Sequence, residues 1–173
     1  MRTVILKWNP SISSFSMLAF LHGIFRNNHA DSFDMNWSVW DYEEIKEGDR
    51  VFFLKVGDYG QCGIVAAGFA LSKPYRSEDW SGKGRTTYYI DLEFDTMLNP
   101  DAVPILTSEQ LSKAIPDFDW TGGHSGVVLT EAQAVQLEQH WDDFLSTHCD
   151  TLKRACTLNR GDKDLVFIKE DFA

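Results

Sequence analysis

Three neighbouring segments between residues 50 and 95 constrain the fold most. Residues 50–56 (RVFFLKV) and 62–71 (CGIVAAGFAL) are rich in β-branched and apolar residues and flank a glycine-containing turn, which predicts a β-hairpin. Residues 87–95 (TYYIDLEFD) alternate apolar and acidic side chains, which predicts a further strand with one face exposed to water. Gly63 and Gly68 inside the second segment indicate a β-bulge or a close approach between strands.

The segments around this centre add shorter strands. Residues 3–8 (TVILKW) predict a buried strand that Pro10 ends. Residues 35–41 (MNWSVWD) predict a short aromatic-rich strand, and residues 125–129 (SGVVL) predict a final one. Between the second and third central segments, we expect residues 72–86 to form a long loop.

Helical signals occur at three places. Apolar residues recur at helical spacing over residues 14–26, and Ser13 or Ser14 is expected to cap that helix. Two further segments have the Thr-x-x-Gln pattern of a capping box, in which two side chains satisfy the first free backbone N–H groups of a helix. They are residues 107–110 and 130–133, and they predict helices at 108–114 and 131–147.

This order of elements predicts an α+β fold. Several strands with glycine-marked turns and helices near the ends favour a small β-barrel of about five to six strands flanked by helices. We expect one domain over residues 1–149. Residues 150–173 form a C-terminal tail of mixed charge with one apolar stretch at 165–168. That stretch predicts either an added edge strand or a loosely held segment.

Composition narrows the class of protein. The chain has 173 residues, 43% of them hydrophobic, which is ample for a packed core, and its net charge is −10. A broadly basic nucleic-acid-binding surface is therefore not expected. The three cysteines include no CxxC pair, so we expect neither a disulfide framework nor a cysteine-based metal site. Without a signal-peptide pattern or a membrane-spanning run, the expected location is the cytoplasm.

Six motifs occur in an order that resembles the EVE domain, a member of the PUA-like superfamily. They are LKWNPS (6–11), NWSVWD (36–41), GDRVFF (48–53), GIVAAGFALSKPY (63–75), YYIDLEF (88–94) and HSGVVLTEAQ (124–133). The similarity spans residues 3–145 and extends to the related YTH domains. Each motif is weakly specific by itself, and their order carries the resemblance.

The resemblance implies a PUA-like β-barrel that binds DNA or RNA carrying a modified base. EVE and YTH domains hold a flipped or unpaired base in an aromatic pocket, so the resemblance implies a binding module. We expect no cofactor or metal and assign no catalytic residue. The sequence departs from the EVE pattern after LKW. Asn9 stands there instead of the usual Ser-Glu pair. The identity of the base and its modification is therefore not specified.

Residues of three motifs form the candidate base-binding pocket. They are Trp8, Asn9, Ser11, Trp37, Ser38, Trp40, Trp120, Gly123, His124 and Ser125. Aromatic rings stack on the face of any base, whereas amide and hydroxyl groups read its edge. We assign stacking to Trp37 and Trp40, with Trp8 or Trp120 as a further ring. Asn9, Ser38 and Ser125 are assigned to the base edge. In the alternative interpretation the tryptophans belong to the core and Asn9 only makes a turn.

The expected loop at residues 72–86 is locally basic. Its cationic side chains are Lys73, Arg76, Lys83 and Arg85. They are candidates for contact with phosphate groups, or else they form an ordinary solvated loop. Since the protein as a whole is acidic, we expect weak non-specific binding to DNA, with a shallow dependence on salt to which these residues contribute much.

Two other functions remain open. Related ASCH-type barrels hydrolyse modified nucleosides with a lysine and a glutamate, for which Lys7 and Glu93 are the nearest candidates. The acidic composition also fits a protein-interaction module. A pocket with tryptophan rings and no buried Lys–carboxylate pair would favour binding. Such a pair would favour hydrolysis, and the absence of a pocket would favour protein interaction.

Overall fold

The hairpin predicted at residues 50–71 lies at the centre of the sheet. The computed structural model describes residues 1–28, 33–79, 81–152 and 167–168. In this part of the chain, β3 (Arg50–Lys55) pairs antiparallel with β4 (Gly63–Ala70), which pairs antiparallel with β6 (Thr86–Met97). All three central strands were therefore predicted correctly, with small differences at their ends.

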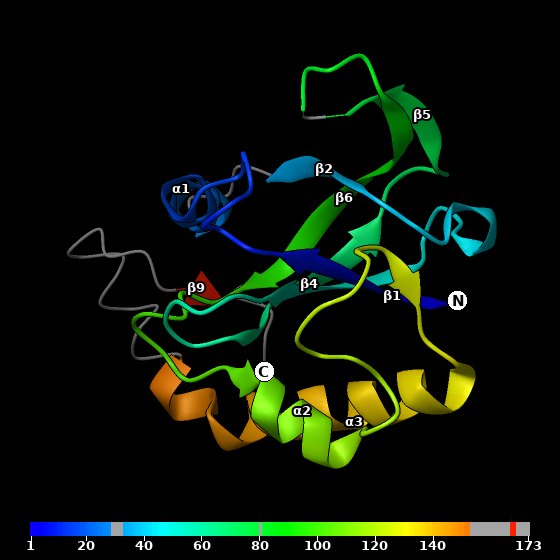
Figure 1. Cartoon of the computed structure of the whole chain (residues 1–173). Coiled ribbons are helices and arrows are strands. Elements are labelled where there is room, and N and C mark those ends of the chain that lie inside the picture. Colours follow the sequence, from blue (N-terminus) through cyan, green and yellow to red (C-terminus); the bar gives the residue numbers. More distant parts are fainter. Residues whose placement is uncertain (29–32, 80, 153–166, 169–173) are drawn as a thin grey trace.

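The N-terminal strand lies inside the sheet. β1 (Thr3–Trp8) pairs parallel with β3 on one side and antiparallel with the short β8 (Val127–Val128) on the other. β2 (Asp34–Ser38) pairs antiparallel with β6, so the strand order is β2-β6-β4-β3-β1-β8. The sheet curls into a half-barrel, with the helices α2 and α3 grouped beneath it in Figure 1. The predicted α+β class and the PUA-like arrangement with flanking helices are confirmed, and the sheet itself is a half-barrel.

Backbone hydrogen bonds join the two ends of this strand order. The N–H groups of Trp40 and Asp41, just after β2, donate to the carbonyl groups of Ser125 and Gly126, just before β8, each over 3.0 Å. The curled sheet is thus bridged by two loops at this point and not by a regular ladder. This junction brings the motifs around residues 37 and 125 together, although they are far apart in the sequence.

The segment expected to be a loop contains a strand. β5 (Tyr75–Glu78) pairs antiparallel with the first part of β6, so much of residues 72–86 forms a hairpin that projects from the top of the molecule in Figure 1. The prediction of a long loop was wrong because polar and charged residues build this strand, which has no apolar alternation. Two further short strands pair with the sheet, β7 (Leu106–Thr107) with β4 and β9 (Phe167–Ile168) with β6. Residues 153–166 and 169–173 of the tail lie outside the described residues.

The helices follow the predicted capping signals, with one shift. α2 (Ser108–Ala114) and α3 (Glu131–Thr147) begin after complete capping boxes, at the predicted residues. α1 (Met17–Asn28) begins later than predicted. Its first turn is capped by Ser16, whose hydroxyl accepts the Ala19 N–H over 3.1 Å, in place of Ser13 or Ser14. A 3₁₀ helix (Tyr42–Glu44) follows β2.

Gly68 allows two strands to approach closely. The register of β4 against β6 shifts between Ala67 and Gly68, and a Cβ atom at Gly68 would lie 1.8 Å from the carbonyl oxygen of Glu93. No residue with a side chain fits there without moving the backbone. The bulge and the close packing predicted from this glycine are both confirmed.

Aromatic rings fill the space between β1, β3 and α1. Phe53 lies at their centre: it stacks against Trp8 with ring centroids 5.2 Å apart and contacts Phe20 and Phe94 at 6.2 and 5.4 Å. On the other side of the sheet, Trp141 of α3 packs edge-on against Phe52 at 5.8 Å. The sheet therefore has an aromatic layer on each face, which holds its curvature.

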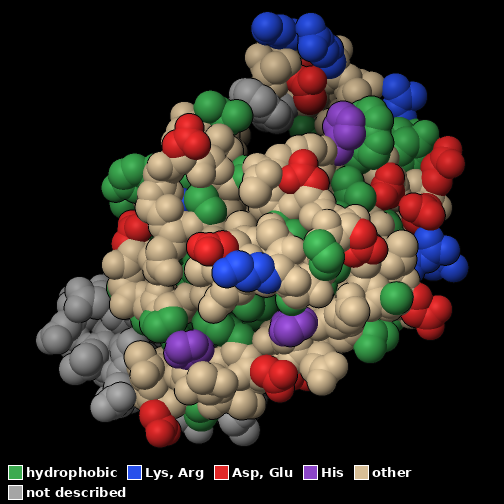
Figure 2. Space-filling model, turned by 60° about the horizontal axis from the view of Figure 1, so that its bottom comes forward, with side chains coloured by type: hydrophobic (Ala, Val, Ile, Leu, Met, Phe, Trp, Pro, Cys, Tyr) green, Lys and Arg blue, Asp and Glu red, His purple; other side chains and the backbone are tan. Residues whose placement is uncertain are grey.

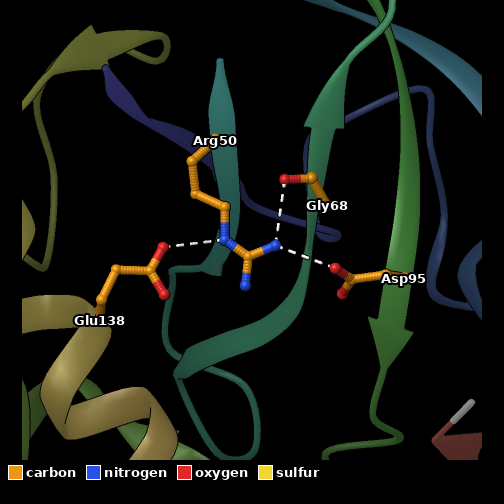
Figure 3. A network of polar contacts seen from close by, with 4 residues as sticks. All are labelled: Arg50, Gly68, Asp95 and Glu138. Carbon is orange, nitrogen blue, oxygen red and sulfur yellow. Dashed lines mark hydrogen bonds and ion pairs between the residues drawn. The ribbon is translucent and has the colours of Figure 1, made fainter. Parts of the chain in front are cut away.

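Arg50 connects β3, β4, β6 and α3. Its Nε donates to Glu138 over 2.9 Å, and its Nη1 donates to Asp95 over 3.0 Å and to the carbonyl of Gly68 over 3.3 Å (Figure 3). The guanidinium also lies 4.9 Å from the ring centre of Phe52. Because the side chain is only 10% exposed, these partners compensate for the loss of water around its charge.

Candidate functional site

A cavity of about 740 Å³ opens beside the point where the two ends of the sheet are bridged. Its walls come from the end of β1 and the following turn, from β2, from the β5–β6 hairpin and from the segment before β8. The lining residues are Lys7, Asn9, Ile12, Ser13, Ser14, Phe15, Met35, Asn36, Trp37, Ser38, Val56, Ser77, Glu78, Tyr89, Gly123 and Ser125. The volume lies in the range of small-molecule sites, and the lining combines aromatic rings with amide and hydroxyl groups.

Two side chains complete the edge of β1 where β8 has ended. The Lys7 N–H donates to the hydroxyl of Ser125 over 2.8 Å, and the indole N–H of Trp37 lies 3.3 Å from the Lys7 carbonyl. The same indole N–H lies 3.0 Å from the Ser125 hydroxyl. Trp37 and Ser125 thus take the place of a neighbouring strand for one residue. This arrangement fixes the polar edge of the Trp37 ring at the cavity wall.

Neighbouring rings set the orientation of Trp37. Its indole meets Phe53 edge-to-face with centroids 4.9 Å apart and Phe15 at 5.9 Å. Phe15 itself is held by the turn after β1, where the Trp8 indole N–H donates to its carbonyl over 2.6 Å. The half-buried Trp37 is therefore a pre-positioned ring in the cavity wall, with its rotation restricted by packing and by hydrogen bonds.

Asn9 both builds the turn after β1 and lines the cavity. Its side-chain oxygen accepts the Ser11 N–H over 3.0 Å, and its backbone carbonyl accepts the Ser13 N–H over 2.9 Å. Gly57 allows this placement, because a Cβ atom there would lie 2.8 Å from the Asn9 side-chain oxygen. The turn chemistry and the pocket position that the sequence offered as alternatives are thus both present.

The side chain of Lys7 places a positive charge at the cavity wall. Its ammonium group donates to the Gly122 carbonyl and lies 5.0 Å from the ring centre of Phe118. Burial lowers the pKa of Lys7 below the usual lysine range, although the nearby Asp119 carboxylate opposes this shift. Gly123 has φ of +82°, and a Cβ atom there would lie 3.2 Å from the ammonium nitrogen. A glycine at this position therefore leaves room for the lysine head group.

Asp119 organises the loop beneath that lysine. Its carboxylate accepts hydrogen bonds from the Thr121 N–H over 2.9 Å, from the Thr121 hydroxyl over 2.8 Å and from the Gly122 N–H over 3.1 Å. These bonds hold the pKa of Asp119 below its usual value. The carboxylate is exposed and does not line the cavity, so it is not the buried partner that a Lys–carboxylate catalytic pair needs.

Half of the candidate pocket residues meet at the cavity. Those in its lining are Asn9, Trp37, Ser38, Gly123 and Ser125. Trp8 and Trp120 are each 1% exposed and lie in the core, where their indole N–H groups bond to the carbonyls of Phe15 and Ile115. The stacking role considered for these two rings therefore does not fit their positions.

Ser11, Trp40 and His124 lie outside the lining. Ser11 is exposed in the turn after β1. Trp40 is 60% exposed, and its ring stacks on the His124 ring with centroids 3.7 Å apart and planes within 2°. Trp40 therefore does not occupy the stacking position inside the cavity that the sequence suggested, because Val39 before it is buried and the next side chain is exposed.

Several lining residues were not predicted. Met35 and Asn36 precede Trp37 on β2, Tyr89 lies opposite Ser38 on β6, and Ser77 and Glu78 belong to β5. The motif around Trp37 already contained the signal for the β2 residues, since neighbouring positions of one strand border the same cavity. The β5 residues gave no such signal, because their segment was expected to be a loop.

The basic side chains lie on the projecting hairpin. Lys73, Arg76, Lys83 and Arg85 are all exposed, the last two in the turn between β5 and β6. Figure 2 shows Lys and Arg side chains gathered at this tip, while Asp and Glu side chains are scattered over the rest of the visible face. Ser77 and Glu78 of the same hairpin line the cavity, so the basic tip belongs to an element that forms part of the cavity wall.

The residues of the hydrolase alternative do not meet. Lys7 lines the cavity, whereas Glu93 lies further along β6, opposite Asp34 and Phe69, and is not part of the lining. Among the described residues no group of three or more His, Cys, Asp or Glu side chains is arranged to hold a metal ion. Within the same residues, no helix has both the length and the apolar character needed to cross a membrane.

Comparison with known proteins identifies the fold. No protein-family model matches the chain, and no curated protein matches its sequence. The crystal structure of human THYN1 protein in complex with 5-methylcytosine containing DNA is similar, with a TM-score of 0.51 and 13% identity over 79% of this chain and 98% of that one. The chain has a PUA-like, EVE-type fold.

YTH domains give weaker matches to this PUA-like chain. A structure of the YTH domain-containing protein mmi1 and RNA complex matches with a TM-score of 0.49 and 12% identity, covering 86% of each chain. The YTH domain of Zygosaccharomyces rouxii MRB1 protein in complex with N6-methyladenosine RNA matches at 0.39 and 14%, over 80% of this chain and 84% of that one. The resemblance to EVE domains that the sequence suggested is confirmed at the level of the fold by the match to human THYN1.

Proposed function

We propose that this protein binds nucleic acid and holds one flipped or unpaired, modified base in the cavity beside Trp37. The observation that carries the proposal is the cavity itself, with an oriented indole in a wall that also contains amide and hydroxyl groups. A base needs a ring to stack on and polar groups at its edge, and this wall supplies both. The similar fold of human THYN1, bound to 5-methylcytosine containing DNA, supports a modified base as the ligand.

The polar groups at the cavity are suited to read the base edge. Asn9, Asn36 and Ser38 provide amides and a hydroxyl, each able to donate and to accept hydrogen bonds. Stacking on Trp37 contributes affinity for every base, so discrimination between bases depends on these edge groups and on the shape of the cavity. We therefore assign stacking to Trp37 alone and edge contacts to the three polar side chains.

The positive charges near the cavity are available to the sugar-phosphate backbone of a bound nucleotide. Lys7 is at the rim, and Lys83 and Arg85 are at the tip of the β5–β6 hairpin. Four exposed cations on an acidic protein give a modest electrostatic contribution, so the base pocket must supply much of the affinity. The affinity therefore comes mainly from the base in the cavity, and unmodified DNA is bound weakly.

A panel of free nucleosides tests the proposal. We expect 5-methyl-2′-deoxycytidine or N6-methyladenosine to bind more tightly than its unmethylated form in calorimetric titrations. Trp37→Ala should weaken binding of every ligand roughly tenfold or more, since stacking contributes about 1–3 kcal/mol per base. Ser38→Ala should instead reduce the ratio between ligands more than the affinity for each. Failure of all nucleosides and of short modified oligonucleotides to bind at millimolar concentration would contradict the proposal.

A further inference from the structure

Trp40 and His124 form a stacked pair of rings on the outer surface. Their centroids are 3.7 Å apart and their planes differ by 2°, so the rings are in full van der Waals contact. Trp40 is nevertheless 60% exposed and His124 is exposed as well. A large aromatic surface is therefore held open to solvent in a fixed orientation, whereas Trp8, Trp120 and Trp141 are each 1% exposed.

The backbone around this pair is held rigidly. The Trp40 N–H donates to the Ser125 carbonyl over 3.0 Å, so the two ring-bearing segments are directly hydrogen-bonded. Gly126, with φ of +79°, packs so tightly that a Cβ atom there would lie 2.2 Å from the Cα atom of Val39. The stacked rings thus stand on the junction that bridges the sheet, and little conformational freedom is lost when a ligand stacks on them.

The pair adjoins the cavity on both of its segments. His124 lies between Gly123 and Ser125, which both line the cavity, and consecutive Cα atoms are about 3.8 Å apart. Trp40 follows two residues after Ser38, which also lines the cavity. The surface of the pair therefore begins at the rim of the cavity.

We propose that the Trp40–His124 pair is a second stacking site, which takes the nucleobase next to the one held in the cavity. This inference rests on the proposed function of the cavity. An exposed indole offers a flat face on which any base stacks without regard to its sequence, and the histidine beneath it keeps that face in place. The site would bind a flanking base that is unpaired, because a base within a duplex presents only its edge.

The test compares a free nucleoside with a trinucleotide. The probes are 5-methyl-2′-deoxycytidine and N6-methyladenosine, together with single-stranded trinucleotides that carry the same modified base at the centre. Two further trinucleotides have an abasic position on the 5′ or the 3′ side. Affinities are measured by calorimetry for the wild type, Trp40→Ala, Trp40→Phe and His124→Ala. Val135→Ala, which shortens a side chain that is 64% exposed on α3, is the matched control.

We expect Trp40→Ala to weaken trinucleotide binding by roughly tenfold and to leave nucleoside binding unchanged, while Trp40→Phe keeps most of the affinity. Removing the flanking base on one side should cost the wild type a similar factor and cost Trp40→Ala nothing, since the two changes remove the same contact. Val135→Ala should match the wild type with every probe, and unchanged nucleoside binding by Trp40→Ala shows that this variant is folded.

The outcomes separate the two proposals. If the wild type binds both kinds of probe but Trp40→Ala binds the trinucleotide equally well, the second stacking site is refuted and the cavity is not. Equal weakening of nucleoside and trinucleotide by Trp40→Ala would also refute it, because Trp40 would then act through the cavity. If the wild type binds neither probe, the proposed function itself fails, and the second site fails with it.

Discussion

Removing the hydroxyl of Ser125 should unfold the protein at a lower temperature. In Ser125→Ala the Lys7 N–H loses the acceptor that lies 2.8 Å away, at a place where β8 no longer covers β1. An amide left without a partner in the protein interior costs about 1–3 kcal/mol. The indole N–H of Trp37 is affected less, because the Lys7 carbonyl remains 3.3 Å from it. The free energy of unfolding is therefore expected to fall by about 2 kcal/mol. The loss is smaller where water from the cavity accepts the Lys7 N–H in place of the hydroxyl.

A thermal unfolding series measures this loss. For a domain of about this size, 1 kcal/mol corresponds to about 2–4 °C, so the melting temperature of Ser125→Ala should fall by about 4–8 °C. Ser125→Thr keeps the hydroxyl and should lose much less. Ser38→Ala, which removes a hydroxyl from the same cavity wall, is the matched control and should melt within about 1–2 °C of the wild type, as expected for a substitution costing under 0.5 kcal/mol.

The same substitution should also affect ligand binding. With one acceptor gone, the Trp37 ring is less firmly oriented, so the affinity for nucleosides should fall as well. If Ser125→Ala and Ser38→Ala melted at the same temperature, the idea that Ser125 and Trp37 substitute for a strand partner of Lys7 would be refuted.

Three further predictions concern charge. Arg50→Lys should destabilise the protein by about 2 kcal/mol in urea unfolding, because two ion pairs and the ring contacts of the guanidinium are each worth under about 1 kcal/mol. Lys113→Met, which removes an exposed ion pair, is the comparison, and an equally small effect of Arg50→Lys would contradict this prediction. Replacing Lys83 and Arg85 by alanine should reduce the salt slope of oligonucleotide binding by about 1–2, and an unchanged slope would exclude the tip from phosphate contact. Burial lowers the pKa of Lys7, so between that pKa and 10.5 the unfolded chain binds more protons, and stability due to this group rises with pH. Unfolding free energies of the wild type and Lys7→Met from pH 7 to 10 should therefore diverge; parallel curves would show that the shift is absent.

The fold was largely predictable because its strongest elements follow local rules. The two capping boxes placed α2 and α3, and the alternation along residues 87–95 placed β6 with its wet face. β5 was not predicted, because its residues, YRSE, have no apolar period and the strand forms through its pairing with β6. Local patterns cannot show a strand that depends on its neighbour alone.

The site was half predictable for a similar reason. Motifs named the segments that meet at the cavity, and Asn9, Trp37 and Ser125 were found within them. Residue type did not show which tryptophan is buried: Trp8 and Trp40 both belong to segments of the candidate site, yet one is 1% exposed and the other 60%. The direction of each ring depends on a turn or on a long-range hydrogen bond, neither of which has a local signature.

The position of β1 between β3 and β8 has a consequence for how the chain is made. Thr3 pairs with Arg50, and Val4 pairs with Val128, which is 124 positions later in the sequence. During synthesis, one edge of β1 therefore stays unpaired until β8 has left the ribosome, even after β3 has paired with the other edge. Pairings so distant in sequence slow folding and leave strand edges open to aggregation meanwhile. A chain truncated after residue 126 should therefore accumulate in aggregates, even though it retains every residue that lines the cavity.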